Sequence, residues 1–129
     1  MSFVIRKGVP EVQELWDELD AKLASGRLSR DEAKFFKKLL KVAAYLAADP
    51  FHNSLESHEI DPLTRRYGRK VFQSYLENQT PAAGRVFWVY GPEKGEITII
   101  GIELHPEDRK SRGYDRVSLS DLPPRDPPT

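Results

Sequence analysis

Residues 85–105, RVFWVYGPEKGEITIIGIELH, constrain the fold more than any other part of the chain. Residues 85–90 and 96–105 are two runs rich in β-branched and aromatic residues, which favour strands. The sequence GPEKG between them is typical of a turn. We therefore expect an antiparallel hairpin, and a hairpin this apolar requires a layer of helices over one face.

Two amphipathic helices are expected ahead of this hairpin. Apolar residues recur at helical spacing after Pro10, and Gly26 ends the run. These apolar residues are Val12, Leu15, Trp16, Leu19 and Leu23. The sequence SRDE at residues 29–32 is a capping box that begins a second helix, which ends before residue 49. Its predicted buried residues are Phe36, Leu39, Leu40, Ala43 and Leu46, and its predicted exposed residues are Lys34, Lys37, Lys38 and Lys41.

The remaining segments complete an α+β domain. Residues 3–5 favour a short first strand, residues 51–67 lose periodicity and are interpreted as a loop, and residues 70–76 alternate as a strand does. The expected fold is an N-terminal strand, a two-helix hairpin and an antiparallel meander of three or four strands, with both helices on one face. If the meander has a fourth strand, residues 114–119 supply it. We expect one domain over residues 1–122 and a disordered proline-rich tail over residues 123–129.

Composition excludes several classes of protein. The 129 residues include no cysteine, which excludes a disulfide scaffold and thiolate chemistry. The N-terminal segment lacks the apolar core of a signal peptide and no apolar run reaches membrane-spanning length, so we expect a cytoplasmic protein. Twenty basic and twenty acidic residues give no net charge, but residues 65–70 and 109–116 are basic runs. These runs are either solvated faces or phosphate contacts.

The expected hairpin places an arginine and a histidine on one side of the sheet. If residues 90 and 96 close the turn, Trp88 lies opposite Thr98 and Arg85 lies opposite Gly101. The more apolar face, with Trp88, Ile100, Ile102 and Leu104, is then expected to pack on the helices. Arg85 and His105 project together from the uncovered face, unless the register slips by one residue.

An arginine and a histidine in one concavity suit RNA cleavage by internal transfer. The attacking 2′-hydroxyl loses a proton, the leaving 5′-oxygen gains one, and negative charge builds on the phosphate between them. Histidine transfers protons near neutral pH, and arginine binds phosphate through a planar charged fork. The alternative interpretation is an ion pair between Arg85 and Glu103, with His105 merely ending a strand.

Three segments resemble the RelE/ParE superfamily of toxins from toxin–antitoxin systems. They are HEIDPLTRRYGRKVFQSYL, GRVFWVY and ITIIGIELHPEDRKSRGY, and the resemblance is best from residue 58 to residue 114. Members of the RelE branch are endoribonucleases that cut mRNA on the ribosome without a metal or cofactor, and a cognate antitoxin protein silences them. The resemblance implies the same activity and the same kind of partner for this chain. The first meander strand departs from the family pattern, because it offers Gln73 where many members place lysines or arginines.

The resemblance also implies roles for particular residues. Arg85 matches the phosphate-binding arginine, His105 the general acid or base at the end of the third meander strand, and Tyr114 the tyrosine that stacks on a base or assists proton transfer. The residues expected to grip the RNA or ribosomal backbone are Arg65, Arg66, Arg69, Lys70, Arg109, Lys110 and Arg112. The ParE branch shares the fold but poisons DNA gyrase, so a protein-binding toxin, or an inactive relative that only binds an antitoxin, stays an alternative.

Other candidate groups are weaker. His52 and His58 have no cysteine or carboxylate cluster around them, which favours capping or surface roles over a metal site. Glu59 is a minor candidate for a general base. No glycine-rich phosphate loop precedes a helix, so no nucleotide cofactor is expected.

Overall fold

The computed structural model describes residues 2–6, 10–76 and 84–103. Its elements in chain order are β1 (Val4–Arg6), α1 (Pro10–Ala24), α2 (Arg30–Ala48), the 3-10 turn η1 (Asn53–Leu55), β2 (His58–Glu59), α3 (Asp61–Tyr67), β3 (Phe72–Tyr75), β4 (Arg85–Tyr90) and β5 (Glu96–Glu103). This arrangement confirms the α+β class. The predicted fourth meander strand, the proline-rich tail, His105 and Tyr114 lie outside the described residues.

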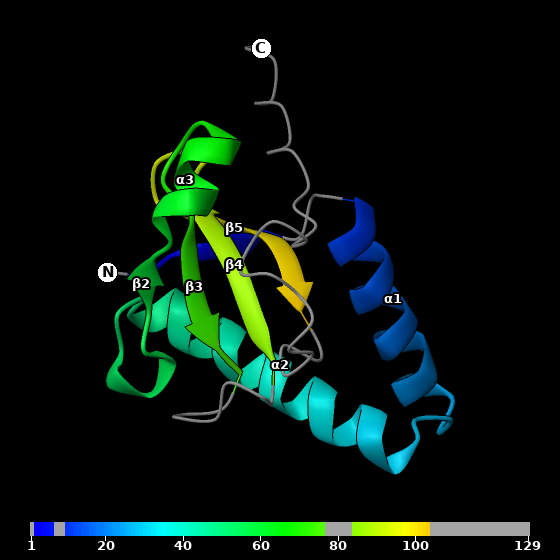
Figure 1. The fold of residues 1–129 in the computed structure, drawn as a ribbon. Helices are drawn as coiled ribbons and strands as arrows, with labels where there is room; N and C mark the ends of the chain where they lie inside the picture. Colours follow the sequence, from blue (N-terminus) through cyan, green and yellow to red (C-terminus); the bar gives the residue numbers. More distant parts are fainter. Residues whose placement is uncertain (1, 7–9, 77–83, 104–129) are drawn as a thin grey trace.

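The strands form one mixed sheet in the order β1-β5-β4-β3-β2. The meander β3-β4-β5 is antiparallel as predicted, whereas β1 pairs with β5 in parallel. Figure 1 shows α2 crossing behind β3 and β4, with α1 beside β5. A parallel neighbour requires a crossover connection, and the two helices provide it between β1 and the rest of the sheet.

The interpretation of residues 51–67 as a loop is wrong. This segment contains η1, the short strand β2 and the helix α3. Asp61 and Pro62 occupy the first turn of α3, where a carboxylate and a proline are both favourable, and Gly68 ends the helix with a φ of 89°. These elements are too short to produce a periodic pattern, so their caps were the available signal.

The turn between α1 and α2 matches its sequence signals. Gly26 has a φ of 72°, and the N–H groups of Gly26 and Arg27 donate to the carbonyls of Leu23 and Lys22, as in a Schellman motif. The Ser29 hydroxyl accepts from the Glu32 N–H, and the Glu32 carboxylate accepts from the Ser29 N–H, which confirms the capping box. The other Glu32 oxygen accepts from Lys22 Nζ at 2.6 Å. Glu32 therefore caps α2 and ties it to α1.

The apolar stripes of both helices are narrower than predicted. Leu23 and Leu40 are exposed rather than buried. Val42 is buried in α2 together with Phe36, Leu39 and Leu46, so the buried positions advance by three, three and four residues. Leu40 lies at the border of that stripe and is 44% exposed.

A β-bulge changes the predicted register of the hairpin. Tyr90 pairs with Ile97, Trp88 with Ile99 and Arg85 with Glu103, with an irregularity between Phe87 and Trp88. The turn holds one more residue than expected and the bulge adds another to β5, so Arg85 lies opposite Glu103 instead of Gly101. The two slips cancel at the open end of the hairpin, so Arg85 and Glu103 share a face as predicted. Between the turn and the bulge only one slip acts, so Trp88 shares its face with Ile99 and the predicted grouping of Trp88 with Ile100 is wrong.

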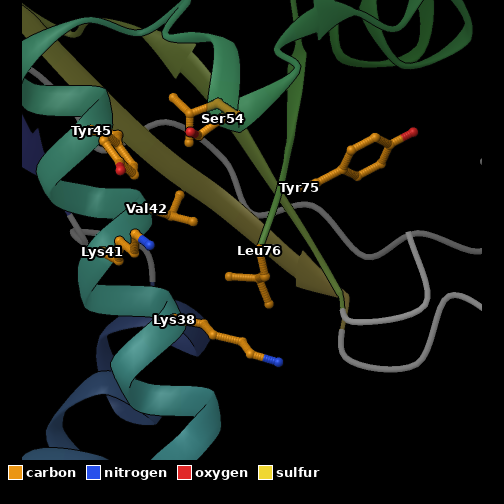
Figure 2. A pocket seen from close by; sticks show the side chains of 8 residues that line it. Lys38, Lys41, Val42, Tyr45, Ser54, Tyr75 and Leu76 are labelled. Carbon is orange, nitrogen blue, oxygen red and sulfur yellow. The ribbon is translucent and has the colours of Figure 1, made fainter. Parts of the chain in front are cut away.

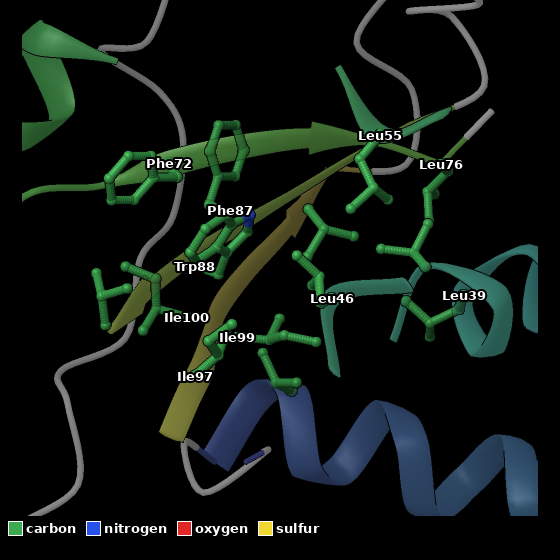
Figure 3. Close-up of a cluster of buried hydrophobic side chains, with 14 of the residues drawn as sticks. Leu39, Leu46, Leu55, Phe72, Leu76, Phe87, Trp88, Ile97, Ile99 and Ile100 are labelled. Carbon is green, nitrogen blue, oxygen red and sulfur yellow. The ribbon is translucent and has the colours of Figure 1, made fainter. Parts of the chain in front are cut away.

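Both faces of β4 are buried from Val86 to Val89, contrary to the prediction of one uncovered face. Phe87 and Val89 lie on the same side of β4 as Arg85 and are fully buried, as is Trp88 on the other side. Phe87, Trp88 and three isoleucines of β5, Ile97, Ile99 and Ile100, belong to one cluster of buried apolar side chains (Figure 3). Trp88 stacks on Phe72 with ring centroids 4.7 Å apart, and its Nε1 donates to the Ser74 hydroxyl at 2.8 Å.

Replacing Ser29 with alanine removes the acceptor for the Glu32 N–H at the start of α2. We expect the free energy of unfolding to fall by about 1 kcal/mol, measured by urea denaturation. Ser25→Ala is the matched control, because the Ser25 hydroxyl is exposed and donates to carbonyls at the end of α1. An equal loss in both variants would contradict the capping assignment.

The ion pair between Lys22 and Glu32 makes stability depend on pH. Hydrogen bonds from Lys22 and then from the Ser29 N–H lower the pKa of Glu32 below its usual 4.5. The stabilisation is therefore complete above pH 4.5 and is lost as the pH falls through the lowered pKa. Glu32→Gln keeps a capping oxygen, so its deficit relative to the wild type at pH 7 should vanish near pH 2 in urea titrations. A deficit that persists in acid would show that the charge is not responsible.

Candidate functional site

Arg85 begins β4 and is held between two side chains of neighbouring strands. Its Nη2 donates to the Glu103 carboxylate on β5, and its Nη1 donates to Gln73 Oε1 on β3 at 3.2 Å. The guanidinium carbon also lies 5.7 Å from the centroid of the Phe87 ring. The side chain of Arg85 is only 14% exposed and that of Glu103 23%. The predicted ion pair between these residues is thus present, and it orients the arginine fork.

The register places further polar side chains on the same face as Arg85. Tyr75 lies opposite Arg85, and Gln73 lies opposite Phe87 on β4 and opposite His58 on β2. Residues directly opposite in an antiparallel pair project to the same side. We call this set the Arg85 face, and it comprises His58, Gln73, Tyr75, Arg85 and Glu103.

His58 brings a titratable ring to the edge of the Arg85 face. Its Nδ1 lies 2.9 Å from the Glu56 carbonyl oxygen, and its ring centroid lies 6.3 Å from that of Tyr75. A carbonyl only accepts, so Nδ1 carries the proton and Nε2 of the neutral ring keeps its lone pair. From the strand spacing, the Cα atoms of His58 and Arg85 lie roughly 12 Å apart. Both side chains project from the same side of the sheet, with Gln73 and Tyr75 between them.

Gly84 positions the start of β4. It has a φ of 120°, and a Cβ there would lie 2.5 Å from Leu76 Cδ1 and 3.1 Å from the Glu103 carbonyl oxygen. Its own carbonyl accepts from the Leu76 N–H at 3.0 Å. The positive φ and the lack of room for a Cβ therefore both favour glycine at position 84, directly before Arg85.

The structure does not bring the first basic run together with Arg85. Arg65 and Arg66 lie in the last turn of α3, and Arg69 and Lys70 follow it; all four are exposed. Arg69 approaches the Tyr90 carbonyl, which is at the other end of β4 from Arg85, about 17 Å along the strand. The other predicted residues, His105, Arg109, Lys110, Arg112 and Tyr114, lie outside the described residues.

The two other histidine and glutamate candidates have different positions. His52 caps η1, since its Nδ1 accepts from the Ser54 N–H, and its ring stacks on Tyr45 at 4.3 Å. This confirms a capping role. Glu59 lies opposite Phe72, so it projects to the face opposite Arg85 and does not meet the arginine. Within the described segments, no group of three or more histidines, aspartates or glutamates is placed to hold a metal ion.

Sequence reasoning missed His58 and Tyr75 as neighbours of Arg85. The register of β2 against β3 joins His58 to the Arg85 face, and residues 58 and 59 alone are too short to show a strand pattern. The alternation of residues 70–76 did place Gln73 and Tyr75 on one side of a strand. Only the pairing of β2 with β3 places His58 on the same face as Gln73 and Tyr75, and that pairing could not be predicted from the sequence.

Comparisons with protein-family models, with curated proteins and with solved structures found no match. Among the residues that the structure describes, no helix has the length and apolar character needed to cross a membrane.

Replacing Gly84 with alanine tests how β4 is positioned. We expect the free energy of unfolding to fall by about 1–3 kcal/mol, because the variant combines an unfavourable φ with a close approach to the Glu103 carbonyl. Gly26→Ala is the matched control, since Gly26 also has a positive φ but no atom within 4 Å of an added Cβ. Chemical denaturation should give the larger loss for Gly84→Ala, and a larger loss at Gly26 would contradict this account.

Proposed function

We propose that this chain is a metal-free endoribonuclease of RelE type, the toxin of a toxin–antitoxin pair, which cleaves mRNA on the ribosome. The observation that carries the proposal is Arg85, held by Gln73 and Glu103 on a face that also bears His58 and Tyr75. This set supplies a fixed cation for a phosphate and a titratable ring for proton transfer.

The proposed reaction is an internal transfer at one phosphodiester. The 2′-oxygen bonds to the adjacent phosphorus, the bond from phosphorus to the 5′-oxygen breaks, and a 2′,3′-cyclic phosphate and a free 5′-hydroxyl result. A base takes the 2′-hydroxyl proton, and an acid protonates the leaving oxygen. Arg85 stabilises the charge that grows on the phosphate oxygens.

His58 is the proton acceptor that we propose from the described residues, because Nε2 has the free lone pair when Nδ1 binds the Glu56 carbonyl. The predictions that His105 acts as acid or base and that Tyr114 assists it stand beside this assignment. Glu103 and Gln73 act as positioning residues that set the plane of the arginine fork.

The exposed basic run from Arg65 to Lys70 supports binding along an RNA or ribosomal backbone away from the reacting phosphate. Its separation from Arg85 by the length of β4 suits a contact several nucleotides along the chain. Arg109, Lys110 and Arg112 remain proposed backbone contacts. A cognate antitoxin is the proposed protein partner.

One observation favours a second candidate function. The Glu103 carboxylate neutralises Arg85, as a purely structural ion pair does. A protein-binding toxin that poisons gyrase, or an inactive relative that only binds an antitoxin, has no need of a free cation. Inhibition of DNA supercoiling by the purified chain, together with no cleavage of RNA, supports this candidate.

Substitution of Arg85 separates the two candidates. With saturating RNA, on ribosomes carrying mRNA and on single-stranded RNA, Arg85→Ala should lower the cleavage rate roughly a hundredfold while RNA binding changes little. Arg85→Lys keeps the charge but loses the two-pronged contact, so it should recover only part of the rate. The matched control is Arg27→Ala, which removes an exposed arginine in the turn between the helices.

Three readouts make this experiment decisive. The products should carry cyclic phosphate ends, form in the presence of a chelator, and disappear when 2′-O-methyl RNA replaces the substrate. Urea denaturation checks folding, because removing Arg85 leaves Gln73 and Glu103 without their partner. A folded Arg85→Ala variant that cleaves at the original rate would end the catalytic assignment.

A further inference from the structure

A cavity of about 220 Å³ lies between α2, η1 and the end of β3. Its lining residues are Lys38, Lys41, Val42, Tyr45, Ser54, Leu55, Tyr75 and Leu76. Figure 2 shows Lys38 and Lys41 on α2 facing the same space as Leu76, with Ser54 above. The cavity thus combines the ammonium groups of Lys38 and Lys41 and the hydroxyls of Tyr45 and Ser54 with an apolar floor of Val42, Leu55 and Leu76.

The charge of α2 points to an anionic ligand. Lys34, Lys37, Lys38 and Lys41 follow at spacings of one, three and four residues, and no acidic residue occurs from residue 33 to residue 48. Lysines three and four residues apart project from adjacent positions on a helix, so their positive potentials add. Lys38 and Lys41 are the two of this series that line the cavity.

The chemistry of the lining favours a phosphate group that carries a sugar and base. Ammonium and hydroxyl groups donate to phosphate oxygens, and the apolar floor suits the ribose and base edges. The Tyr45 ring is already stacked on His52 at 4.3 Å, and Lys41 lies 5.8 Å from its centroid. Tyr45 therefore contributes its hydroxyl end and not a free ring face.

The position of the cavity links it to the Arg85 face. Tyr75 lines the cavity and lies directly opposite Arg85 in the sheet. Figure 2 shows Leu76 pointing toward α2 and Tyr75 pointing away from it. β2 pairs with Phe72 and Gln73, and Ser57 Oγ lies 2.6 Å from Ser74 Oγ. These contacts flank the edge of β3 up to Ser74 and do not extend to Tyr75.

We propose that this cavity binds a second phosphate of the RNA chain whose reacting phosphate lies at Arg85. The RNA passes around the end of β3 at Tyr75, with one phosphate on each side. This inference rests on the proposed function for the identity of the ligand, whereas the cavity and its charge do not depend on it.

The test uses Lys38→Ala and Lys41→Ala, singly and together, in the full chain. Alanine favours helix, so α2 should be preserved. Binding of a fluorescent 2′-O-methyl oligoribonucleotide, which cannot be cleaved, is measured by anisotropy over a range of salt concentrations. The double variant should bind roughly tenfold more weakly, and the salt slope should fall by roughly 0.7 for each lysine removed. Lys37→Ala removes the same charge from an exposed position on α2 that does not line the cavity, and should have a much smaller effect.

Cleavage kinetics separate failure of this inference from failure of the proposed function. With cleavable RNA, the double variant should raise KM and leave kcat unchanged, since the cavity does not contact the reacting phosphate. If the wild type cleaves RNA but the double variant has unchanged affinity and KM, the cavity inference falls and the nuclease stands. If the wild type binds the oligonucleotide through these lysines but cleaves nothing, the nuclease falls and the cavity stands. If Lys38 and Lys41 are needed for binding an acidic helical peptide but not for binding the oligoribonucleotide, the inference of an RNA site is overturned.

Discussion

β4 lies between β3 and β5, and the pairing of its six residues with β5 determines which side chains of these two strands share a face. The bulge beside Trp88 is decisive in that pairing, because a single inserted residue reverses which side chains share a face. With the bulge, Trp88 and Ile99 lie together, and Arg85 meets Glu103. Without it, the arginine fork would lose its carboxylate partner. The polar face and the apolar core thus depend on the same backbone irregularity.

The sequence predicted the elements whose patterns are long. β4 was predicted with its observed bounds, and both helices were recognised from their apolar spacing, with Gly26 and the capping box at Ser29 marking the turn. Patterns of this kind are local, so they can be read without knowing the fold. Three features did not follow from these patterns. The parallel pairing of β1 was not predicted, and the predicted register of the hairpin and the interpretation of residues 51–67 as a loop were wrong. Each depends on contacts between distant segments or on elements of a few residues, which no local pattern records.

The candidate site was predictable only in part for the same reason. Arg85 and its possible ion pair with Glu103 follow from strand alternation, because both residues lie on strands of strong pattern. His58 reaches the same face through β2, whose two residues pair with β3. Arg65 and Arg66 belong to α3, a helix that was not predicted. Their distance from Arg85 therefore could not be predicted from the sequence. A run of basic residues in the sequence shows local charge only, and the fold decides whether those side chains lie near Arg85.

The parallel contact between β1 and β5 has a consequence for how the molecule is made. Val4 pairs with Glu96, and Arg6 forms a 2.9 Å ion pair with the same glutamate. During synthesis from the N-terminus, β1 therefore has no strand to pair with until nearly a hundred residues have been added. Closing such a long loop costs entropy before the pairing compensates for it, so this pairing of distant segments slows the completion of the fold. The helical hairpin can form early from local contacts, but β1 can join the sheet only after β5 has emerged.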